Sequence, residues 1–562
     1  MKILSLHCDY IKFKPLKKAL KNPEELSEKR KNEIIVKEPL VLMIAVEKKD
    51  EENPDLLKSL THEIKEIAKS VKAQNLVLYP YAHLSSSLSN PEFALKTLEQ
   101  AEKNLKKDFY IERAPFGYYK EFELKVKGHP LSELSRDIHF SGEIKNEEYD
   151  YKKLLKEIVK SKLDTRNLKE NDHRIIGQQM DLFSFSDIAP GMVFWHNNGL
   201  IIRNKLIEYW REEQNKLGYL EIQTPQIMDK KLWQISGHWE KYKENIFISE
   251  YEKRDFALKP MNCPGAMLVY KSKPKSYKEL PLRMAEIGIV HRQELSGVLS
   301  GLFRVIQFTQ DDAHIFSTEK KLEEEIENII NLIDKFYKTF RFEYHVELST
   351  RPEKKIGDEK LWNKAEKILQ DILETKKLDF KINKGEGAFY GPKIDFHILD
   401  SLKRTWQLAT IQLDFAMPER FDLTYTDKDN KLKRPIMIHR VIYGSIERFI
   451  GILLEHTNGH LPLWLSPIQI RILNFTDKNN KSCEKLFEEL TNKNIRADLD
   501  LTQEPLGGKI KQAEVEKIPY IIVIGDKEEK SGNLAVRRNG KISDIKTEEF
   551  IKSVLKEVED KD

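Results

Sequence analysis

Two strand-like segments on either side of a glycine-containing loop, between Leu282 and Phe316, restrict most strongly how this chain can fold. In the second segment polar and aromatic residues recur at even spacing. A strand places side chains two positions apart on the same face of a sheet. We therefore expect one face to carry Arg304, Phe308, Gln310, Asp312 and His314.

Two interpretations of this polar face are open. Charges without partners are costly to bury, so the face can be the solvated side of an antiparallel sheet. Alternatively, Arg304 converges with Arg292, at the end of the first segment, because the face binds an anionic nucleotide. The combination of cations, ring, amide, carboxylate and imidazole favours the nucleotide site.

The composition is that of an ordinary globular protein. With 562 residues, 33% of them charged and 40% hydrophobic, the chain is long enough for three or four domains of roughly 150 residues each. A net charge of +4 gives no overall electrostatic reason to bind nucleic acid, so any RNA contact must come from local basic patches. The cysteines Cys8, Cys263 and Cys483 are too few and too far apart for a disulfide framework. Because we see no signal peptide and no membrane-spanning run, we expect a cytoplasmic protein without membrane contact.

The chain is predicted to contain four segments, with boundaries at residues 1–142, 143–180, 181–465 and 466–562. The first is an α/β module with a helical stripe from Leu56 to Val71, and its strands are expected at residues 2–13, 40–48, 75–84 and 118–128. The second is a lysine-rich helical connector. The last is a compact α/β domain, with strands expected at residues 467–475, 495–501, 519–525 and 533–538.

The segment from Leu282 to Phe316 resembles the second signature motif of class II aminoacyl-tRNA synthetases. Its letters DDAHIF resemble those of threonyl-tRNA synthetases in particular. WREEQNKLGYLEIQTPQI is similar to the first class II motif, a helix followed by a strand that ends at Pro225. HRVIYGSIERFIGILLEH is similar to the third motif, and LKPMNCPGAM and GAFYGPKIDFHI are threonyl-type blocks. The match runs from about Asp172 to the C-terminus.

This resemblance implies that residues 181–465 form a class II catalytic domain around an antiparallel sheet. The positions that grip ATP phosphates are matched by Arg292, Arg304 and Arg448. The adenine-stacking position is matched by Phe308, with Glu294 beside it and Gln407 as a further ATP-binding position. The catalytic positions are matched by Arg292, Arg448 and Lys393. Mg²⁺ is expected to accompany ATP. Taken alone, each arginine is better explained as a surface ion pair, and it is their occurrence together, in motif order, that favours a functional role.

The resemblance also implies a metal and a threonine site. By spacing alone, Cys263, His314 and His439 form no recognisable zinc pattern, and a single cysteine is usually a buried apolar residue. All three nevertheless match the zinc ligands of threonyl-tRNA synthetases, which implies one Zn²⁺ per chain with an open coordination position. The threonine-binding positions are matched by Gln310, Asp312, Tyr390 and Gln412.

The first segment resembles the archaeal threonyl-tRNA synthetase editing domain, which has the fold of D-aminoacyl-tRNA deacylases. Four segments carry this resemblance: MKILSLHCDYIKF, VLYPYAHLSSSL, APFGYYKEFEL and KGHPLSELSR. The bacterial type carries an HxxxH motif, and the first 180 residues contain none. The functional positions of the archaeal type are matched by His83, Lys120 and Glu133. Without the resemblance, His83 and Lys120 would be interpreted as a strand-end residue and one lysine among many.

Residues 466–562 resemble the anticodon-binding domain of this synthetase subclass. Its anticodon-contacting positions are matched by Glu528 and Arg537, and by Gln503 where the bacterial pattern has asparagine. Splayed single-stranded bases are recognised by hydrogen bonds and stacking, and an amide of either length can read a base edge.

The fold expected is therefore multidomain α/β and α+β, with a deacylase-like editing domain, an antiparallel-sheet class II core and an α/β anticodon-binding domain. The resemblance implies a threonine–tRNA ligase that uses ATP, threonine and tRNA(Thr), edits seryl-tRNA(Thr) and forms a homodimer. Two alternatives remain. One is a synthetase of the same subclass for serine, proline or glycine, and the other is a synthetase-like RNA-binding regulatory protein without ligase activity.

Overall fold

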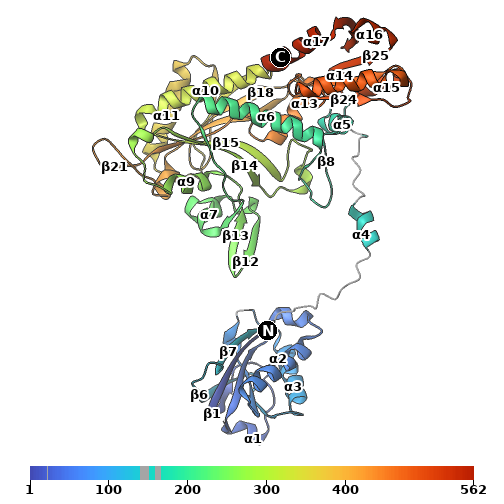
Figure 1. The fold of residues 1–562 in the computed structure, drawn as a ribbon. Helices are drawn as coiled ribbons and strands as arrows, with labels where there is room; N and C mark the ends of the chain where they lie inside the picture. Colours follow the sequence, from blue (N-terminus) through green and yellow to red (C-terminus); the bar gives the residue numbers. More distant parts are fainter. Residues whose placement is uncertain (22, 86, 139–150, 159–165, 167, 562) are drawn as a thin grey trace. The chain divides into compact units, whose positions relative to one another are not determined.

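The computed structural model describes residues 1–562 apart from 22, 86, 139–150, 159–165, 167 and 562 (Figure 1). It divides into two compact units, Met1–Tyr151 and Lys152–Asp562, and each is described by itself. Within the described ranges, no helix is both long enough and apolar enough to cross a membrane.

The N-terminal unit is built on a seven-stranded sheet whose long first strand pairs with four others. Its strands are β1 (Lys2–Lys18), β2 (Ile34–Lys37), β3 (Pro39–Ala45), β4 (Asn75–Pro80), β5 (Tyr110–Arg113), β6 (Tyr118–Val126) and β7 (Glu133–Asp137). The strands β3, β4 and β5 are parallel, and they are connected by the helices α2 (Leu56–Val71) and α3 (Pro91–Leu105). The helical stripe is confirmed, because Leu60 and Ile64 are fully buried in the core beneath α2.

All four strands predicted in this unit are present, whereas three short strands and two helices, α1 (Glu28–Lys31) and α3, were missed. Strands β2, β5 and β7 are four or five residues long, too short for an alternating pattern to stand out. Helix α3 does have a periodic stripe, with Ala94, Leu98, Ala101 and Leu105 all buried, so the sequence held a signal for it.

The predicted helical connector, residues 143–180, lies partly outside the described residues. Within it the structure has α4 (Tyr151–Ile158) and α5 (His173–Gln179). Helix α5 is part of the C-terminal unit. Ile176 on this helix and Met180, which follows it, belong to the main hydrophobic core of that unit.

The C-terminal unit centres on an eight-stranded, mainly antiparallel sheet in the order β10-β14-β15-β22-β19-β18-β16-β17. The strands are β10 (Leu220–Glu221), β14 (Leu282–His291), β15 (Gln307–Ser317), β16 (Glu343–Ser349), β17 (Phe380–Asn383), β18 (Lys393–Leu399), β19 (Thr405–Asp414) and β22 (Ile436–Val441). The principal helices of this core are α6 (Asn197–Lys216), α10 (Leu322–Thr339), α11 (Glu359–Thr375) and α13 (Ile446–Thr457). A smaller sheet consists of β11 (Ile227–Asp229), β12 (Ile248–Tyr251) and β13 (Arg254–Leu258), and α9 (Cys263–Lys271) follows it.

Strand alternation separates the two faces of the large sheet. In β22, Ile436 and Ile438 join the core formed with α6, α10, α11 and α13, because side chains two apart share a face. His439 therefore projects from the opposite face. The helices cover the face that carries Ile436 and Ile438, so polar side chains can lie on the opposite face without being buried in the apolar core.

Two local predictions need correction. Arg304 does not lie on β15, which begins at Gln307; instead it belongs to a turn in which Ser300 bridges to Arg304. The strand of the first motif was expected to end at Pro225, but β10 covers Leu220–Glu221 alone. A strand needs a partner along its length, and β10 pairs with β14 at these two positions only.

The last segment of the chain is a five-stranded sheet in the order β24-β23-β25-β26-β27. Its strands are β23 (Ile470–Asn474), β24 (Ala497–Asp500), β25 (Tyr520–Ile524), β26 (Asn533–Arg538) and β27 (Lys541–Lys546), and its helices are α14 (Asn480–Asn492), α15 (Leu506–Val515), α16 (Asp526–Ser531) and α17 (Thr547–Asp560). The four predicted strands are confirmed. The missed fifth, β27, follows a two-residue turn at Asn539 and Gly540, both with positive φ, and Asn-Gly is a strong hairpin signal.

Candidate active site

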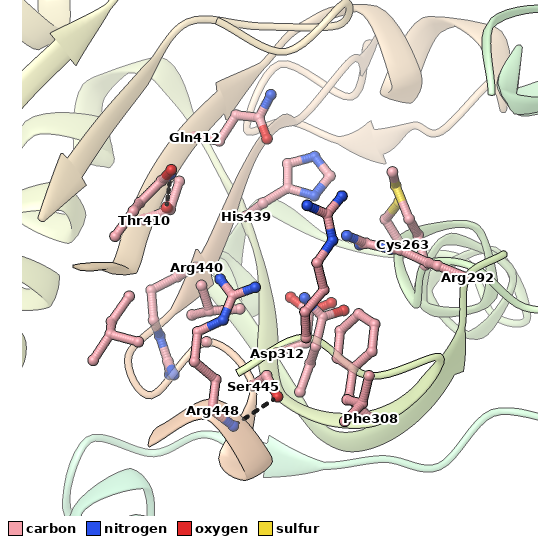
Figure 2. Close-up of a pocket in the computed structure, with 18 of the residues that line it drawn as sticks. Cys263, Arg292, Phe308, Asp312, Thr410, Gln412, His439, Arg440, Ser445 and Arg448 are labelled. Atoms are coloured by element: carbon pink, nitrogen blue, oxygen red, sulfur yellow. Dashed lines mark hydrogen bonds between the residues drawn. The ribbon is translucent and has the colours of Figure 1, made fainter. Parts of the chain in front are cut away.

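A cavity of about 340 Å³ opens on the polar face of the large sheet (Figure 2). Of the residues predicted to act in catalysis or in metal binding, those that line it are Cys263, Arg292, Glu294, Arg304, Phe308, Gln310, Asp312, His314, Tyr390, Gln407, Gln412, His439 and Arg448. The structure thus brings together positions that are separated by up to 185 residues in the chain. Asp312 is 9% and His314 1% exposed, which rules out the solvated outer face.

Strand register places the residues of β15 in this cavity. Phe308, Gln310, Asp312 and His314 alternate along the strand and all line the cavity, so the predicted common face is confirmed for these four. Arg304 reaches the same cavity from the turn before β15, although it is not on the strand.

Three guanidinium groups converge on the cavity. Arg292 lies with its guanidinium carbon 5.1 Å from the centroid of the Phe308 ring and donates from Nε to the Pro260 carbonyl at 3.2 Å. Arg448, on α13, donates from Nε to the Phe303 carbonyl at 2.8 Å. Burial lowers the pKa of Arg448, and the nearby cations Arg304 and Arg292 lower it further. Such mutual repulsion is relieved by a bound anion.

The three arginines differ in how much charge they leave available. The Arg292 and Arg448 bonds given above go to neutral carbonyl groups. Arg304 instead forms an ion pair with Glu294 at 2.9 Å, and its side chain is half exposed. Neutral acceptors orient a guanidinium group without cancelling its charge, so Arg292 and Arg448 are the better prepared for a phosphate.

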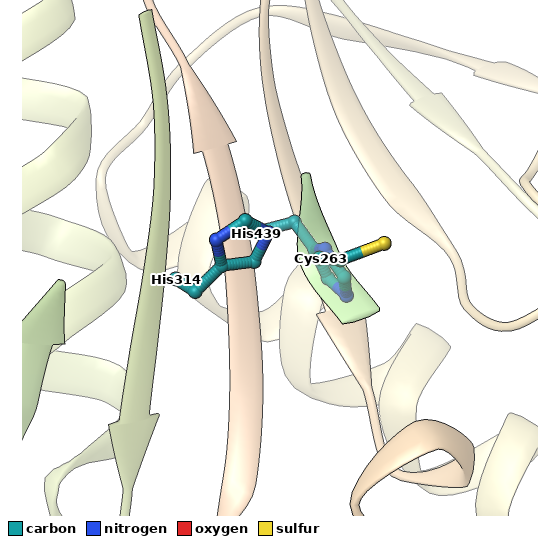
Figure 3. Close-up of side chains that lie close together, drawn as sticks. All are labelled: Cys263, His314 and His439. Carbon is teal, nitrogen blue, oxygen red and sulfur yellow. The ribbon is translucent and has the colours of Figure 1, made fainter. Parts of the chain in front are cut away.

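Cys263, His314 and His439 form one cluster beside the arginines, with ligand atoms all within 4.8 Å of one another (Figure 3). They come from the start of α9, from β15 and from β22, where His314 and His439 are direct cross-strand partners. All three are buried. Neither their spacing nor their local pattern indicated this proximity; it depends on strand pairing.

The surroundings of this cluster suit a cation with soft ligands. The buried Nε2 of His314 has no hydrogen-bond partner among the described residues. Burial lowers the pKa of His314 to about 4, so the ring is neutral and able to coordinate. His439 Nε2 lies 3.0 Å from Asp414 Oδ2, the outer carboxylate that metal-bound histidines commonly have. Burial raises the pKa of the Cys263 thiol, and the nearby Asp312 and Asp414 raise it further, so a bound metal would have to deprotonate it. One cysteine sulfur and two imidazoles form a donor set that zinc accepts.

Lys393 is not among the described residues that line the cavity. Its ammonium pairs with Asp395 at 2.5 Å. The Asp395 carboxylate also accepts from Gln407 at 2.5 Å, Ser349 at 2.7 Å and Thr410 at 2.9 Å. The Asp395 carboxylate therefore fixes the positions of both Lys393 and Gln407.

Several lining residues were not singled out from the sequence, among them Phe303, Thr410 and Ser445. Ser445 lies in the third motif and caps α13 by accepting from the Arg448 backbone. A serine directly before a helix is a typical N-cap residue, so the sequence could have indicated the position of Ser445. Thr410 reaches the cavity through the pairing of β19 with β18 and β22, and Phe303 reaches it from the turn before β15, neither of which a local pattern reveals.

A second cavity, of about 470 Å³, lies in the N-terminal unit and is lined mainly by aromatic and aliphatic side chains. It brings together two of the predicted editing residues, His83 and Lys120. Lys120 Nζ donates to the carbonyls of Pro115 at 3.0 Å and Tyr118 at 3.2 Å, and it lies 5.1 Å from the centroid of the Tyr79 ring. The third predicted residue, Glu133, is exposed on β7 and is not among the described residues lining this cavity.

The predicted anticodon residues are spread over the C-terminal sheet domain. Gln503 is exposed in the loop before α15. Glu528 accepts from the backbone of Gly525 at 3.0 Å and caps α16. Arg537, on β26, lies 3.9 Å from Glu514 of α15. Arg537 and the loop with Gln503 border α15, whereas Glu528 caps its own helix.

Comparisons with known proteins agree with this arrangement. Three family models match the chain: the "tRNA synthetase class II core domain (G, H, P, S and T)" over residues 244–457, the "Archaea-specific editing domain of threonyl-tRNA synthetase" over residues 1–138, and an "Anticodon binding domain" over residues 469–557. The large antiparallel sheet with its arginine-lined cavity is thus the core of a class II aminoacyl-tRNA synthetase.

The similar proteins indicate which class II aminoacyl-tRNA synthetase family the chain belongs to. A threonine–tRNA ligase of Carboxydothermus hydrogenoformans is 52% identical over 396 residues, which cover 70% of this chain and 62% of that protein. One of Clostridium botulinum (strain Kyoto / Type A2) is 44% identical over 539 residues, 90% of this chain and 82% of that protein. The chain belongs to the threonyl-tRNA synthetase family. It spans about 62% of the length of the first relatives it matches.

Solved structures agree with the relatives. The structure titled as the RNA binding domain of threonyl-tRNA synthetase from Cryptosporidium parvum is 38% identical with a TM-score of 0.67, and covers 68% of this chain and 98% of that one. A putative threonyl-tRNA synthetase ThrRS-1 from Aeropyrum pernix is 28% identical with a TM-score of 0.61, and covers 69% of this chain and 96% of that one.

We predict that Lys120 titrates near pH 8. Burial lowers its pKa from 10.5 to about 8, because a buried ammonium loses hydration. Since the folded chain then binds the proton less tightly than the unfolded chain, stability should rise with pH between about 8 and 10.5. NMR titration after isotopic dimethylation of lysines, with Lys120→Arg to assign the resonance, measures the midpoint. A midpoint close to 10.5 would contradict the effect of burial.

Proposed function

We propose that the chain is a threonine–tRNA ligase that activates threonine with ATP and transfers it to tRNA(Thr). The observation that carries the proposal is one cavity in which three arginines converge beside a Cys–His–His cluster. Joining a carboxylate to a phosphate requires two anions to be held close together while their charge is neutralised. Arginines at the anion site and polar donors at the amino-acid site meet that requirement.

ATP occupies the arginine side of the cavity. Arg292, Arg304 and Arg448 hold the phosphates, with Mg²⁺ accompanying the nucleotide, and charge on phosphate oxygens is stabilised by such positioned cations. The adenine stacks on Phe308, with Glu294 and Gln407 as further contacts. Lys393 acts on the reacting phosphate after exchanging its bond to Asp395 for one to the nucleotide.

Threonine occupies the cysteine and histidine side. Asp312 pairs with the substrate ammonium, and Gln310, Tyr390 and Gln412 position its polar groups. Cys263, His314 and His439 would hold one Zn²⁺, which when bound supplies a Lewis acid that recognises the amino and hydroxyl groups of threonine.

A site built around a hydroxyl group cannot reject serine well. Valine has the shape of threonine without the hydroxyl, and such sites discriminate by about 10⁴–10⁵. Serine keeps the hydroxyl and lacks one methyl group, a difference of about 1–3 kcal/mol. Serine is therefore attached to tRNA(Thr) by mistake, and a separate hydrolytic site is required.

The N-terminal unit supplies that hydrolytic site. Lys120 offers positive charge to the oxyanion that forms when the ester of seryl-tRNA(Thr) is attacked, and His83 offers a hydrogen bond in the same cavity. Glu133 approaches the ester only when the tRNA 3′ end is bound, because in the free chain it lies outside the cavity.

The remaining assignments concern organisation. The boundaries proposed are 1–142 for editing, 143–180 for the connector, 181–465 for catalysis and 466–562 for the anticodon-binding domain, in which Gln503, Glu528 and Arg537 contact the anticodon. We propose a homodimer, formed through the first class II motif, and a cytoplasmic location, which suits three free cysteines.

Zinc analysis tests the metal assignment. We expect the purified protein to hold about one zinc per chain, because the Cys–His–His set matches catalytic zinc sites. Cys263→Ala should lower the content to near zero, whereas Cys483→Ala should not, since Cys483 is buried in the core of the C-terminal sheet domain. Metal-free protein that remains fully active after chelation would refute the assignment.

Pyrophosphate exchange tests the ligase proposal. The unaltered chain should exchange with threonine, weakly with serine and hardly with valine. Arg292→Ala and Arg448→Ala should each lower threonine-dependent exchange at least about 100-fold, because positioned charge at a transition state is worth that much. Arg254→Ala, an exposed residue at the start of β13, serves as control. Tight tRNA binding without exchange for any amino acid would favour the regulatory protein instead.

Deacylation of Ser-tRNA(Thr) tests the editing site. Lys120→Ala should slow hydrolysis about 100-fold, whereas Lys125→Ala, an exposed lysine of the same strand paired with Asp9 at 3.1 Å, should not. Threonine exchange should be unchanged in both variants. Equal hydrolysis by both would place editing elsewhere.

A further inference from the structure

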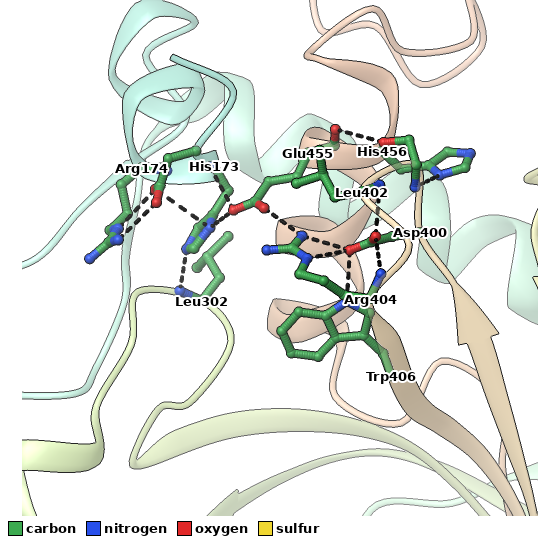
Figure 4. Close-up of polar contacts among 11 residues, drawn as sticks. His173, Arg174, Leu302, Asp400, Leu402, Arg404, Trp406, Glu455 and His456 are labelled. Carbon is green, nitrogen blue, oxygen red and sulfur yellow. Dashed lines mark hydrogen bonds and ion pairs between the residues drawn. The ribbon is translucent and has the colours of Figure 1, made fainter. Parts of the chain in front are cut away.

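A buried histidine, His173 at the start of α5, lies behind the turn that forms one wall of the nucleotide cavity (Figure 4). Its ring is fully buried. Nε2 lies 3.0 Å from the backbone nitrogen of Leu302, and Nδ1 lies 2.6 Å from Glu455 Oε1. Sequence reasoning did not single out either His173 or Glu455.

The chemistry of these partners decides the protonation of the ring. The Leu302 N–H can only donate, so Nε2 must accept and carries no proton. The ring proton is therefore on Nδ1 and is donated to Glu455. Glu455 also accepts from the His173 backbone at 3.0 Å and from Arg404 at 2.6 Å, which keeps its carboxylate in place.

The turn is shaped around this ring. Gly301 has φ +49°, and a Cβ there would lie 2.2 Å from His173 Nε2. On the next positions, the centroid of the Phe303 ring lies 4.2 Å from that of His173 and 4.5 Å from that of Trp406. The hydrogen bond from Leu302 to His173 and the packing of the Phe303 ring against His173 and Trp406 thus hold the turn against α5 and β19.

The same turn orients a residue of the cavity. The Phe303 carbonyl accepts from Arg448 Nε at 2.8 Å, and Phe303 and Arg304 both line the cavity. Arg448 and Glu455 are both on α13, seven residues or about two turns apart. These contacts therefore form a closed circuit: α13 contacts His173 through Glu455, His173 contacts the turn, and the turn contacts Arg448 on α13.

A metal ion is the competing explanation for this cluster. Asp172, His173 and Glu455 do have ligand atoms close enough for one. However, both ring nitrogens of His173 are already bonded. Asp172 pairs with Arg174 at 2.8 Å, and Glu455 pairs with Arg404 at 2.6 Å. Because its ligand atoms already have hydrogen-bond or ion-pair partners, we interpret the cluster as a support for the turn at Leu302 and not as a metal site.

We propose that His173 is a positioning residue for ATP: by accepting from Leu302 it fixes the turn whose Phe303 carbonyl aims Arg448 at the phosphates. The proposal rests on the assignment of this cavity to ATP. It concerns nucleotide affinity and leaves the Cys–His–His side of the cavity unaffected.

Two substitutions of His173 separate its bonds in the full-length chain. In His173→Gln the side-chain amide reaches the position of Nε2 and keeps an acceptor for Leu302. In His173→Asn the shorter amide reaches only the position of Nδ1. Equilibrium binding of ATP should weaken about tenfold in His173→Asn, as expected for one buried hydrogen bond, and less than about threefold in His173→Gln. The KM for threonine should be unchanged in both.

Gly301→Ala tests the same contact from the turn, in case His173→Asn does not fold. Its methyl group displaces the His173 ring, so ATP affinity should fall here too, with the threonine KM unchanged. Unaltered ATP affinity in His173→Asn and Gly301→Ala, or equal weakening in His173→Gln and His173→Asn, would overturn the proposal. ATP binding needs neither threonine nor tRNA, so a wild type that binds ATP but lacks threonine-dependent exchange would refute the ligase function and leave this inference to be judged on its own variants.

Discussion

The pairing of β15 with β22 is the constraint on which the candidate site depends. It sets His314 directly opposite His439, and strand alternation then sends Asp312, Gln310 and Phe308 into the same cavity. A slip of one residue would turn every one of these side chains into the helix-covered core. Such a slip would bury charged side chains in an apolar layer, which is costly. The hydrophobic residues on the helix-covered face therefore fix the register that places the polar residues in the cavity.

Charge in the site is controlled by what each cation is bonded to. Arg292 and Arg448 are oriented by backbone carbonyls, which leaves their charge for an anion. Lys393 is neutralised by its ion pair with Asp395. In the cavity of the N-terminal unit, whose walls are mainly apolar, burial lowers the pKa of Lys120. Burial has the same effect on Arg448 in the cavity of the C-terminal unit, because a buried cation loses hydration.

Much of the fold was predictable because most strands and helices carry a clear periodic pattern. Four of the seven strands of the N-terminal sheet, four of the five strands of the C-terminal sheet and the stripe of α2 were found in this way. Short edge strands such as β5 have too few residues for a pattern. Arg304 was assigned to a strand because its spacing is even, yet β15 begins three residues later. Spacing reports which face a residue would occupy and does not report where pairing begins.

The sequence by itself determined the family and the positions of the arginines in the second and third motifs, and it predicted the three metal-ligand positions, since these follow from motif residues. Only the tertiary structure decided that Cys263 meets His314 and His439 and that His173 supports the turn at Leu302. The physical reason is that these contacts join residues 51 to 176 positions apart in the chain. Hydrogen bonding and burial act through space, and local sequence patterns contain no information on which distant strands will pair.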